Sequence, residues 1–88
     1  MESKVVYQIV LTSSAKKDLS GLDATTQRRI LQKLVDLATT PRGIDTLKLR
    51  NDERYRTRVG DYRILYTIND AAKTVTISSI RHRREVYR

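Results

Sequence analysis

The sequence contains no cysteine, tryptophan or phenylalanine, and it has one histidine, one methionine and one proline among its 88 residues. Without cysteine the chain can have no disulfide framework, no thiolate nucleophile and no cysteine-containing zinc site, which fits a reducing cytoplasm. The core must therefore be built from Val, Ile, Leu and Ala, together with the apolar bodies of five tyrosines.

Long apolar runs and metal-binding clusters are lacking as well. The apolar run within residues 1–12 is far shorter than a signal-peptide core or the roughly 20 residues that span a membrane. His82 has no neighbouring histidine, and the ten acidic residues are scattered along the chain rather than spaced as a ligand set. We therefore expect a soluble, cytoplasmic protein that uses no metal and no other cofactor.

Positive charge is abundant and unevenly distributed. Eighteen Lys and Arg residues stand against ten Asp and Glu residues, and the net charge of +8 divides into +2 for residues 1–41 and +6 for residues 42–88. Ten of the twelve cations in the second half are arginines, whose planar guanidinium group binds phosphate through two bonds and stacks on bases. This composition favours a nucleic-acid partner, although a merely solvated basic surface stays open at this point.

The first half of the chain predicts one strand and two helices within a single domain of residues 1–88. Residues 5–11 are rich in β-branched and aromatic side chains and predict a buried strand. A short helix then runs to about Ser20 and ends at Gly21, where a left-handed backbone is expected. Asp23 is a suitable N-cap for a longer helix over residues 24–39.

Apolar residues recur at helical spacing along the longer helix and predict one buried stripe. The stripe consists of Ile30, Leu31, Leu34, Val35, Leu37 and Ala38. The opposite, solvent-facing side is expected to carry Gln27, Arg28, Gln32 and Asp36. Pro41 and Gly43 close the helix, and a loop through Leu47 and Leu49 leads to the second half.

From Tyr55 onward the hydrophobic period changes to two. Strands are predicted over Tyr55–Val59, Tyr62–Asn69 and Thr74 to about His82, connected by Gly60-Asp61 and by residues 69–73. The order of elements predicts an α+β fold: an N-terminal strand, two helices and a three-stranded antiparallel meander, with the helices packed on one face of the sheet.

The two-residue connection fixes the register of the first hairpin, so that Arg58 faces Arg63 and Arg56 faces Leu65. One face of the hairpin is mostly apolar and carries Tyr55, Thr57, Val59, Tyr62, Ile64, Tyr66 and Ile68. The other face carries Arg56, Arg58, Arg63 and Leu65. Like charges directly opposite each other destabilise an antiparallel pair, so the pair is best explained by a polyanion or an acidic partner segment that occupies this face. An exposed face whose long cations splay into solvent is the alternative, and anion binding does not by itself imply cleavage.

The last eight residues contain four arginines, the single histidine and a tyrosine. A charged, frayed tail is the simplest interpretation, but Val86 and Tyr87 are apolar enough to dock. The alternation of the last strand breaks at residues 78–80, which suggests a bulge and leaves the faces of Arg81 and His82 undetermined.

Three blocks of this sequence, residues 48–50, 55–66 and 82–87, resemble the RelE/ParE toxin superfamily, and the resemblance covers nearly the whole chain. The pattern YRxRxGDYRxxY in residues 55–66 is fairly specific for the superfamily. RelE-type members cut messenger RNA, typically in the ribosomal A site, and are silenced by a co-expressed antitoxin; ParE-type members poison DNA gyrase. The tail HRREVY favours the RelE-type branch.

The resemblance implies functional roles for Arg56, Arg58, Arg63, Arg83 and Tyr87, and the other candidates are cationic or polar residues near them in the sequence. The expected catalytic residues are Arg58, Arg63, Arg83 and Tyr87. The expected substrate-binding residues are Arg56, Arg50, Arg81, His82 and Arg84. The helix charges Arg28, Arg29 and Lys33 are expected to form a solvated face, and contact with an antitoxin is the alternative.

A metal-free ribonuclease can use the substrate's own 2′-hydroxyl as nucleophile, so the protein has to position the phosphate, neutralise its developing charge and move two protons. Many members have lysines where this chain has Arg56 and Arg58, and an arginine stays protonated and cannot accept a proton. The general base is therefore left open between Tyr87, whose hydroxyl is favoured to ionise among cations, His82 and neither. Inhibition of gyrase and non-catalytic binding of nucleic acid are the rival functions.

Overall fold

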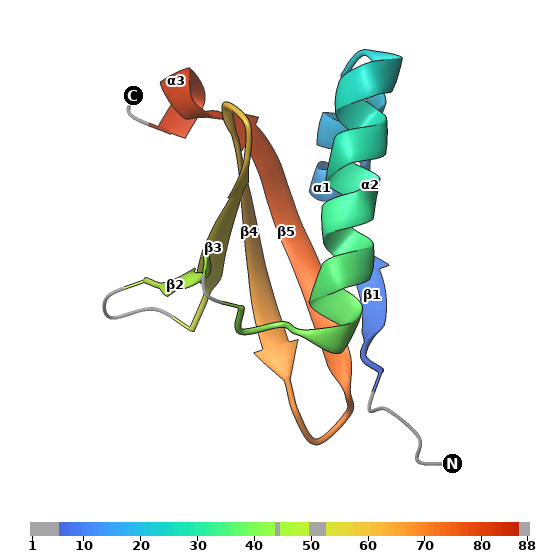
Figure 1. Cartoon of the computed structure of the whole chain (residues 1–88), viewed down its shortest axis with the longest axis vertical. Coiled ribbons are helices and arrows are strands. Elements are labelled where there is room, and N and C mark those ends of the chain that lie inside the picture. The colour runs from blue at the N-terminus through green and yellow to red at the C-terminus, as the bar shows by residue number, and fades with distance from the viewer. Residues whose placement is uncertain (1–5, 44, 50–52, 87–88) are drawn as a thin grey trace.

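The computed structural model describes residues 6–43, 45–49 and 53–86, and in these residues it contains three helices and a five-stranded sheet (Figure 1). The elements in chain order are β1 (Gln8–Leu11), α1 (Ser13–Ser20), α2 (Ala24–Thr39), β2 (Leu47–Lys48), β3 (Tyr55–Val59), β4 (Tyr62–Asn69), β5 (Thr74–His82) and α3 (Arg83–Val86). The strand order is β1-β5-β4-β3-β2, with β1 parallel to β5 and the other pairs antiparallel. The predicted α+β class and meander are confirmed, and the structure adds β2 and α3.

Side chains at the N-terminal ends of α1 and α2 cap these helices. The side chain of Thr12 accepts a hydrogen bond from the backbone N–H of Ala15 at 3.1 Å, and Asp23 accepts one from the N–H of Thr26 at 3.4 Å. These bonds satisfy backbone donors that have no partner within the first turn of a helix. The bounds predicted for the longer helix are confirmed.

The turn between α1 and α2 differs from the prediction in two respects. Gly21 has φ −85°, so the helix ends without the left-handed residue that was expected there. The amide of Gln27 instead donates hydrogen bonds to the carbonyl oxygens of Leu19 and Leu22, at 2.9 and 3.1 Å. Gln27 is therefore half-buried at the turn and does not lie on the solvent-facing side of α2.

Beyond the end of β1, the outer edge of β5 is covered by α1 and its N-cap residue. Strand β1 pairs with β5 only as far as Ile77. Beyond that point the hydroxyl of Thr12 donates to the carbonyl of Ser78 at 3.2 Å, and the carboxylate of Asp18 accepts the N–H of Ile80 at 2.9 Å. The edge of a sheet presents unpaired backbone groups, and these two side chains satisfy groups that β1 does not reach.

The core lies between α2, α1 and the sheet. Its buried members are Ala15, Ile30, Leu34, Leu37, Ile64, Tyr66, Val75, Ile77 and Ile80. The predicted stripe is thus correct for Ile30, Leu34 and Leu37, but wrong for Leu31 and Val35, which are 46% and 62% exposed. Each residue turns a helix by about 100°, so these two side chains turn away from the side of α2 that packs on the sheet.

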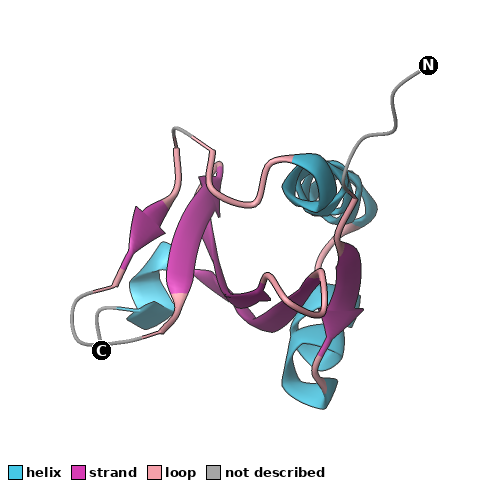
Figure 2. Ribbon diagram, turned by 90° about the horizontal axis from the view of Figure 1, so that it is seen from below, coloured by secondary structure: helices cyan, strands magenta, loops and turns pink. Residues whose placement is uncertain are grey.

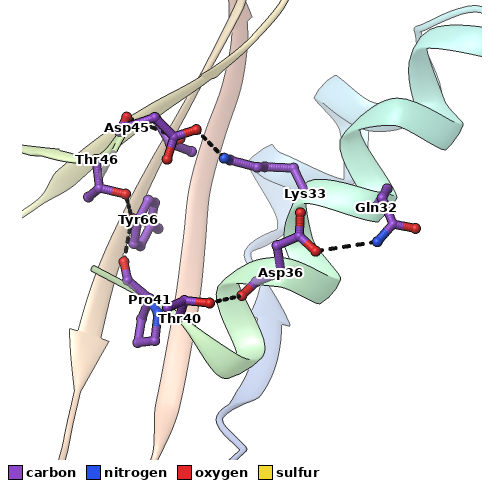
Figure 3. A network of polar contacts seen from close by, with 9 residues as sticks. Gln32, Lys33, Asp36, Thr40, Pro41, Asp45, Thr46 and Tyr66 are labelled. Carbon is purple, nitrogen blue, oxygen red and sulfur yellow. Dashed lines mark hydrogen bonds and ion pairs between the residues drawn. The ribbon is translucent and has the colours of Figure 1, made fainter. Parts of the chain in front are cut away.

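An ion pair and hydrogen bonds connect the loop after α2 to the helix and to the sheet (Figure 3). The ammonium group of Lys33 forms an ion pair with Asp45, whose pKa is lowered chiefly by this hydrogen bond. On the sheet side, the hydroxyl of Tyr66 donates to the carbonyl of Pro41 at 2.7 Å and lies 3.2 Å from the hydroxyl oxygen of Thr46. Burial raises the pKa of the Tyr66 phenol, so this group remains a neutral donor.

A second polar cluster joins the loop after α2 to the turn between β4 and β5. The guanidinium of Arg42 donates to both carboxylate oxygens of Asp70, at 3.2 and 3.0 Å, and to the hydroxyl of Tyr55 at 3.1 Å. The hydroxyl of Tyr7 donates to Asp70 at 2.6 Å. Hydrogen bonds from Arg42 and then Tyr7 lower the pKa of Asp70 from 3.8 to about 2.

The depressed pKa of Asp70 predicts a loss of stability in acid. Because the pKa is lower in the folded chain than in the unfolded chain, the contribution of Asp70 is complete above its ordinary value of 3.8 and is lost as the pH falls towards 2. We expect the melting temperature of the native protein to exceed that of Asp70→Asn at pH 6, and the difference to vanish in this acid range. An Asp61→Asn variant is the charge-matched control, and a pH-independent difference for Asp70→Asn would contradict the prediction.

Candidate anion-binding site

The β3–β4 hairpin has the predicted register at every position. Tyr55 pairs with Tyr66, Arg56 with Leu65, Thr57 with Ile64, Arg58 with Arg63, and Val59 with Tyr62. Gly60 at the tip has φ +57°, a left-handed conformation that glycine adopts at little cost. A Cβ at this position would lie 3.2 Å from the guanidinium of Arg29, but the exposed end of that side chain can move aside, so the positive φ is the reason for glycine here.

Pairing of β4 with β5 extends the opposed arginines into a row of three. Arg63 faces Arg58 on one side and Arg81 on the other, and directly opposed residues of neighbouring strands lie on the same face of a sheet. We call Arg58, Arg63 and Arg81 the arginine row. Each of its three strands contributes one guanidinium group.

A β-bulge determines which face Arg81 occupies. Leu65 pairs with Ser79, whereas the next residue, Tyr66, pairs with Ile77, so Ser78 is the extra residue of β5. The hydroxyl of Ser78 donates to the carbonyl of Leu65 at 3.0 Å. The break in alternation predicted at residues 78–80 is therefore a bulge, and it brings Arg81 to the face of Arg63.

Three of the predicted arginines line one pocket of about 350 Å³. Arg56, Arg58 and Arg63 form its cationic part, and Asp45, Thr46 and Leu47 also line it. Arg63 is only 6% exposed, Arg56 is half-buried and Arg58 is exposed. The buried guanidinium of Arg63 is held by its surroundings, so it can bind an anion without being reoriented.

Asp18 lies beside Arg81, at one end of the arginine row. Its carboxylate oxygen Oδ2 lies 3.6 Å from Nε of Arg81 and also accepts the N–H of Ile80. One carboxylate thus holds both the backbone of β5 and the last guanidinium of the row. No local sequence pattern indicates this role, because Asp18 is 62 residues from Ile80 along the chain.

His82 does not lie with the arginines. It pairs with Tyr62, which belongs to the apolar face of the hairpin, and the two rings meet edge to face with centroids 5.2 Å apart. Nδ1 of His82 accepts the N–H of Arg84 at 3.2 Å. A separate pocket of about 440 Å³ contains His82, Tyr62, Lys17 and Asp18 among its lining residues.

The tail returns to the hairpin after β5. The N–H of Arg83 donates to the carbonyl of Asp61 at 2.8 Å, and Figure 1 shows α3 beside the hairpin tip, with the sheet between it and α2, an arrangement that Figure 2 shows from below. Arg83 and Arg84 are exposed. Arg50 and Tyr87 lie outside the described residues, so their predicted roles stay predictions.

The described part of the chain shows neither a membrane-spanning helix nor a metal-binding group. None of its helices is long and apolar enough to cross a membrane. No three His, Asp or Glu side chains of residues 6–43, 45–49 and 53–86 gather as a potential metal site.

Comparison with known proteins agrees with this architecture. The family model of the ParE toxin of type II toxin–antitoxin systems matches residues 9–87. Toxin RelG of Mycobacterium tuberculosis is 32% identical, over 93% of this chain and 97% of its own.

Solved structures show the same fold. The RelBE2 toxin–antitoxin complex of Mycobacterium tuberculosis matches with a TM-score of 0.82 at 28% identity, over 93% of this chain and 97% of the compared chain. The isolated E. coli RelE toxin matches with a TM-score of 0.78 at 25% identity, over 92% and 90%.

The chain therefore belongs to the ParE toxin family of type II toxin–antitoxin systems, within the RelE/ParE superfamily. This confirms the resemblance carried by residues 48–50, 55–66 and 82–87. The family model bears the ParE name, whereas the similar curated protein and solved structures bear RelE-type names.

Proposed function

We propose that the protein is a metal-independent endoribonuclease that cleaves messenger RNA at the ribosomal A site in the cytoplasm. The arginine row, with Arg56 beside it, is the observation that carries the proposal. Opposed arginines add nothing favourable to the pairing of strands, whereas together they form a preorganised site for a phosphate.

In the proposed reaction the 2′-hydroxyl of the RNA attacks the adjacent phosphorus atom. A bond forms between O2′ and phosphorus, and the bond to the 5′-oxygen of the next nucleotide breaks. The nucleophile loses a proton and the leaving oxygen gains one, which yields a 2′,3′-cyclic phosphate and a 5′-hydroxyl end. Arg58 and Arg63 would neutralise the charge that develops on the non-bridging oxygens.

The other site residues have supporting roles in this proposal. Arg56 would clamp the RNA backbone, and Arg81 would bind the same phosphate group from β5. Arg83 would donate to the leaving oxygen, a role supported by the attachment of its backbone to the hairpin tip. The proposed substrate contacts also include Arg50 and Arg84, while Tyr87 and His82 remain candidates for the proton transfers.

A cognate antitoxin is the expected protein partner. Structures of related toxins from Mycobacterium tuberculosis, Pyrococcus horikoshii and E. coli contain RelB-type antitoxins or are described as toxin–antitoxin complexes. An acidic or amphipathic antitoxin segment that covers the arginine row would supply counter-charge and block RNA at the same time.

Inhibition of DNA gyrase is the second candidate function, because the matching family model describes a ParE toxin. Mapping of RNA 5′ ends after induction of the toxin in translating cells distinguishes the two. We expect new 5′-hydroxyl ends inside translated codons, and none after induction of an Arg63→Ala variant. Gyrase-linked DNA breaks without new RNA ends would overturn the proposal, and salt-sensitive RNA binding without cleavage would indicate a non-catalytic binding module.

A further inference from the structure

A second basic pocket lies between α2 and the tip of the β3–β4 hairpin. It has a volume of about 510 Å³, and its lining residues include Arg28, Arg29 and Lys33 of α2 together with Arg58 and Gly60 of the hairpin. We call it the α2–hairpin groove. The roles proposed above for RNA cleavage do not use its α2 side.

The groove carries an excess of positive charge. Asp36 is the one acidic residue that lines it, against four cations. Lys33 is paired with Asp45, and the Asp36 carboxylate accepts a hydrogen bond from Gln32 on its own helix at 3.3 Å. Within the described segments, no ion pair joins a carboxylate to Arg28, Arg29 or Arg58.

The groove and the anion-binding site share a lining residue. Arg58 lines both the groove and the pocket that contains Arg56 and Arg63. A polyanion with one phosphate at Arg63 can therefore pass Arg58 and continue towards α2. At the tip, Gly60 leaves room for the guanidinium of Arg29, whose nitrogens lie 3.2 and 3.3 Å from where a Cβ would be.

We propose that the α2–hairpin groove binds the sugar–phosphate backbone of single-stranded RNA next to the cleaved phosphate. The inference rests on the proposed function and extends it from one phosphate to a path along the strand. Guanidinium groups bind phosphate through two bonds and tolerate any base sequence. The exposed apolar residues of α2 that an amphipathic protein helix would require, Leu31 and Val35, are not among the residues that line the groove.

Binding of uncleavable RNA tests the groove separately from catalysis. The probes are a 2′-O-methylated dinucleotide, which covers only the arginine row, and a longer 2′-O-methylated single strand. Affinity is measured by competition and fluorescence anisotropy over a series of salt concentrations. We expect the double variant Arg28→Ser/Arg29→Ser to bind the dinucleotide as the native protein does and the longer strand at least tenfold more weakly. For this variant and the longer strand, the slope of log affinity against log salt concentration should be smaller in magnitude by about 1.4, because two phosphate contacts are lost.

The matched control is Lys16→Ser/Lys17→Ser, which removes the same charge from α1 and should leave the longer strand's affinity and slope unchanged. An unchanged affinity of the α2 variant for the longer strand would overturn the inference, as would an equal loss in both double variants. If Arg28→Ser/Arg29→Ser bound the antitoxin more weakly but bound RNA normally, the groove would be assigned to a protein partner instead. If both probes bind as expected but unmodified RNA is not cleaved, the proposed function fails while the groove stands.

Discussion

Replacing Arg63 by alanine should lower the rate of RNA cleavage about 100- to 1,000-fold while leaving the fold intact, as is typical when one preorganised donor to a developing anion is removed. Arg63 is the central member of the arginine row, between Arg58 and Arg81, and it is 6% exposed. Its guanidinium is therefore held in position by the protein before substrate binds. The measurement is the single-turnover cleavage rate on programmed ribosomes, with circular dichroism to verify folding.

Two further variants show whether geometry or charge is responsible. Arg63→Lys keeps the charge but loses the planar fork of donors, so it should recover only a small part of the lost rate. Lys16→Ala removes a cation from exposed α1 and should cleave like the native protein. Equal rates for Arg63→Ala and the native protein would exclude Arg63 from the reaction and leave the buried arginine without an explanation.

The parts of the site that the sequence predicted depend on short-range rules. A two-residue turn determines the register of a hairpin, and alternation then determines the face of every side chain in it. Arg56, Arg58 and Arg63 were placed correctly for this reason. The cap at Asp23 is equally local, since it requires only a side chain and an N–H group three residues apart.

The parts that the sequence did not predict depend on contacts between distant segments. The face of Arg81 follows from a bulge whose position is set by pairing with β4, and the same bulge turns His82 towards Tyr62 instead of the arginines. The contact of Asp18 with β5 exists only because β1 ends at Leu11 and leaves the edge for α1 to cover. No pattern within α1 indicates this.

The errors on α2 have a related cause. Leu31 and Val35 fit a helical apolar pattern, but their exposure depends on how much of the helix surface the sheet covers. Strand β2 was predicted as a loop because its two residues form a strand only through pairing with Arg56 and Tyr55. Periodicity identifies an apolar stripe, but its buried width is decided by the tertiary structure.

Loss of the Tyr66 hydroxyl should lower the stability of the fold, although this group takes no part in the proposed chemistry. Tyr66→Phe is expected to lower the free energy of unfolding by about 1 to 3 kcal/mol, because the buried carbonyl of Pro41 loses its donor. Tyr66→Ala also removes a fully buried ring and should cost about 3 to 5 kcal/mol. A small domain has little more than that in total, so we expect this variant to be largely unfolded. Urea denaturation followed by circular dichroism measures both effects.

Tyr55→Phe is the matched control, because its hydroxyl accepts an exposed hydrogen bond from Arg42 rather than serving a buried carbonyl, and the substitution should cost less than about 1 kcal/mol. Equal stability of Tyr66→Phe and the native protein would show that the bond to Pro41 contributes nothing. Tyr66 and Arg63 project from opposite faces of β4, because Tyr66 lies three positions after Arg63 and successive side chains of a strand alternate between its faces. Folded Tyr66→Phe should therefore cleave RNA at the native rate, whereas folded Arg63→Ala should not, and the pair of variants separates the face of β4 that stabilises the domain from the face that binds the phosphate.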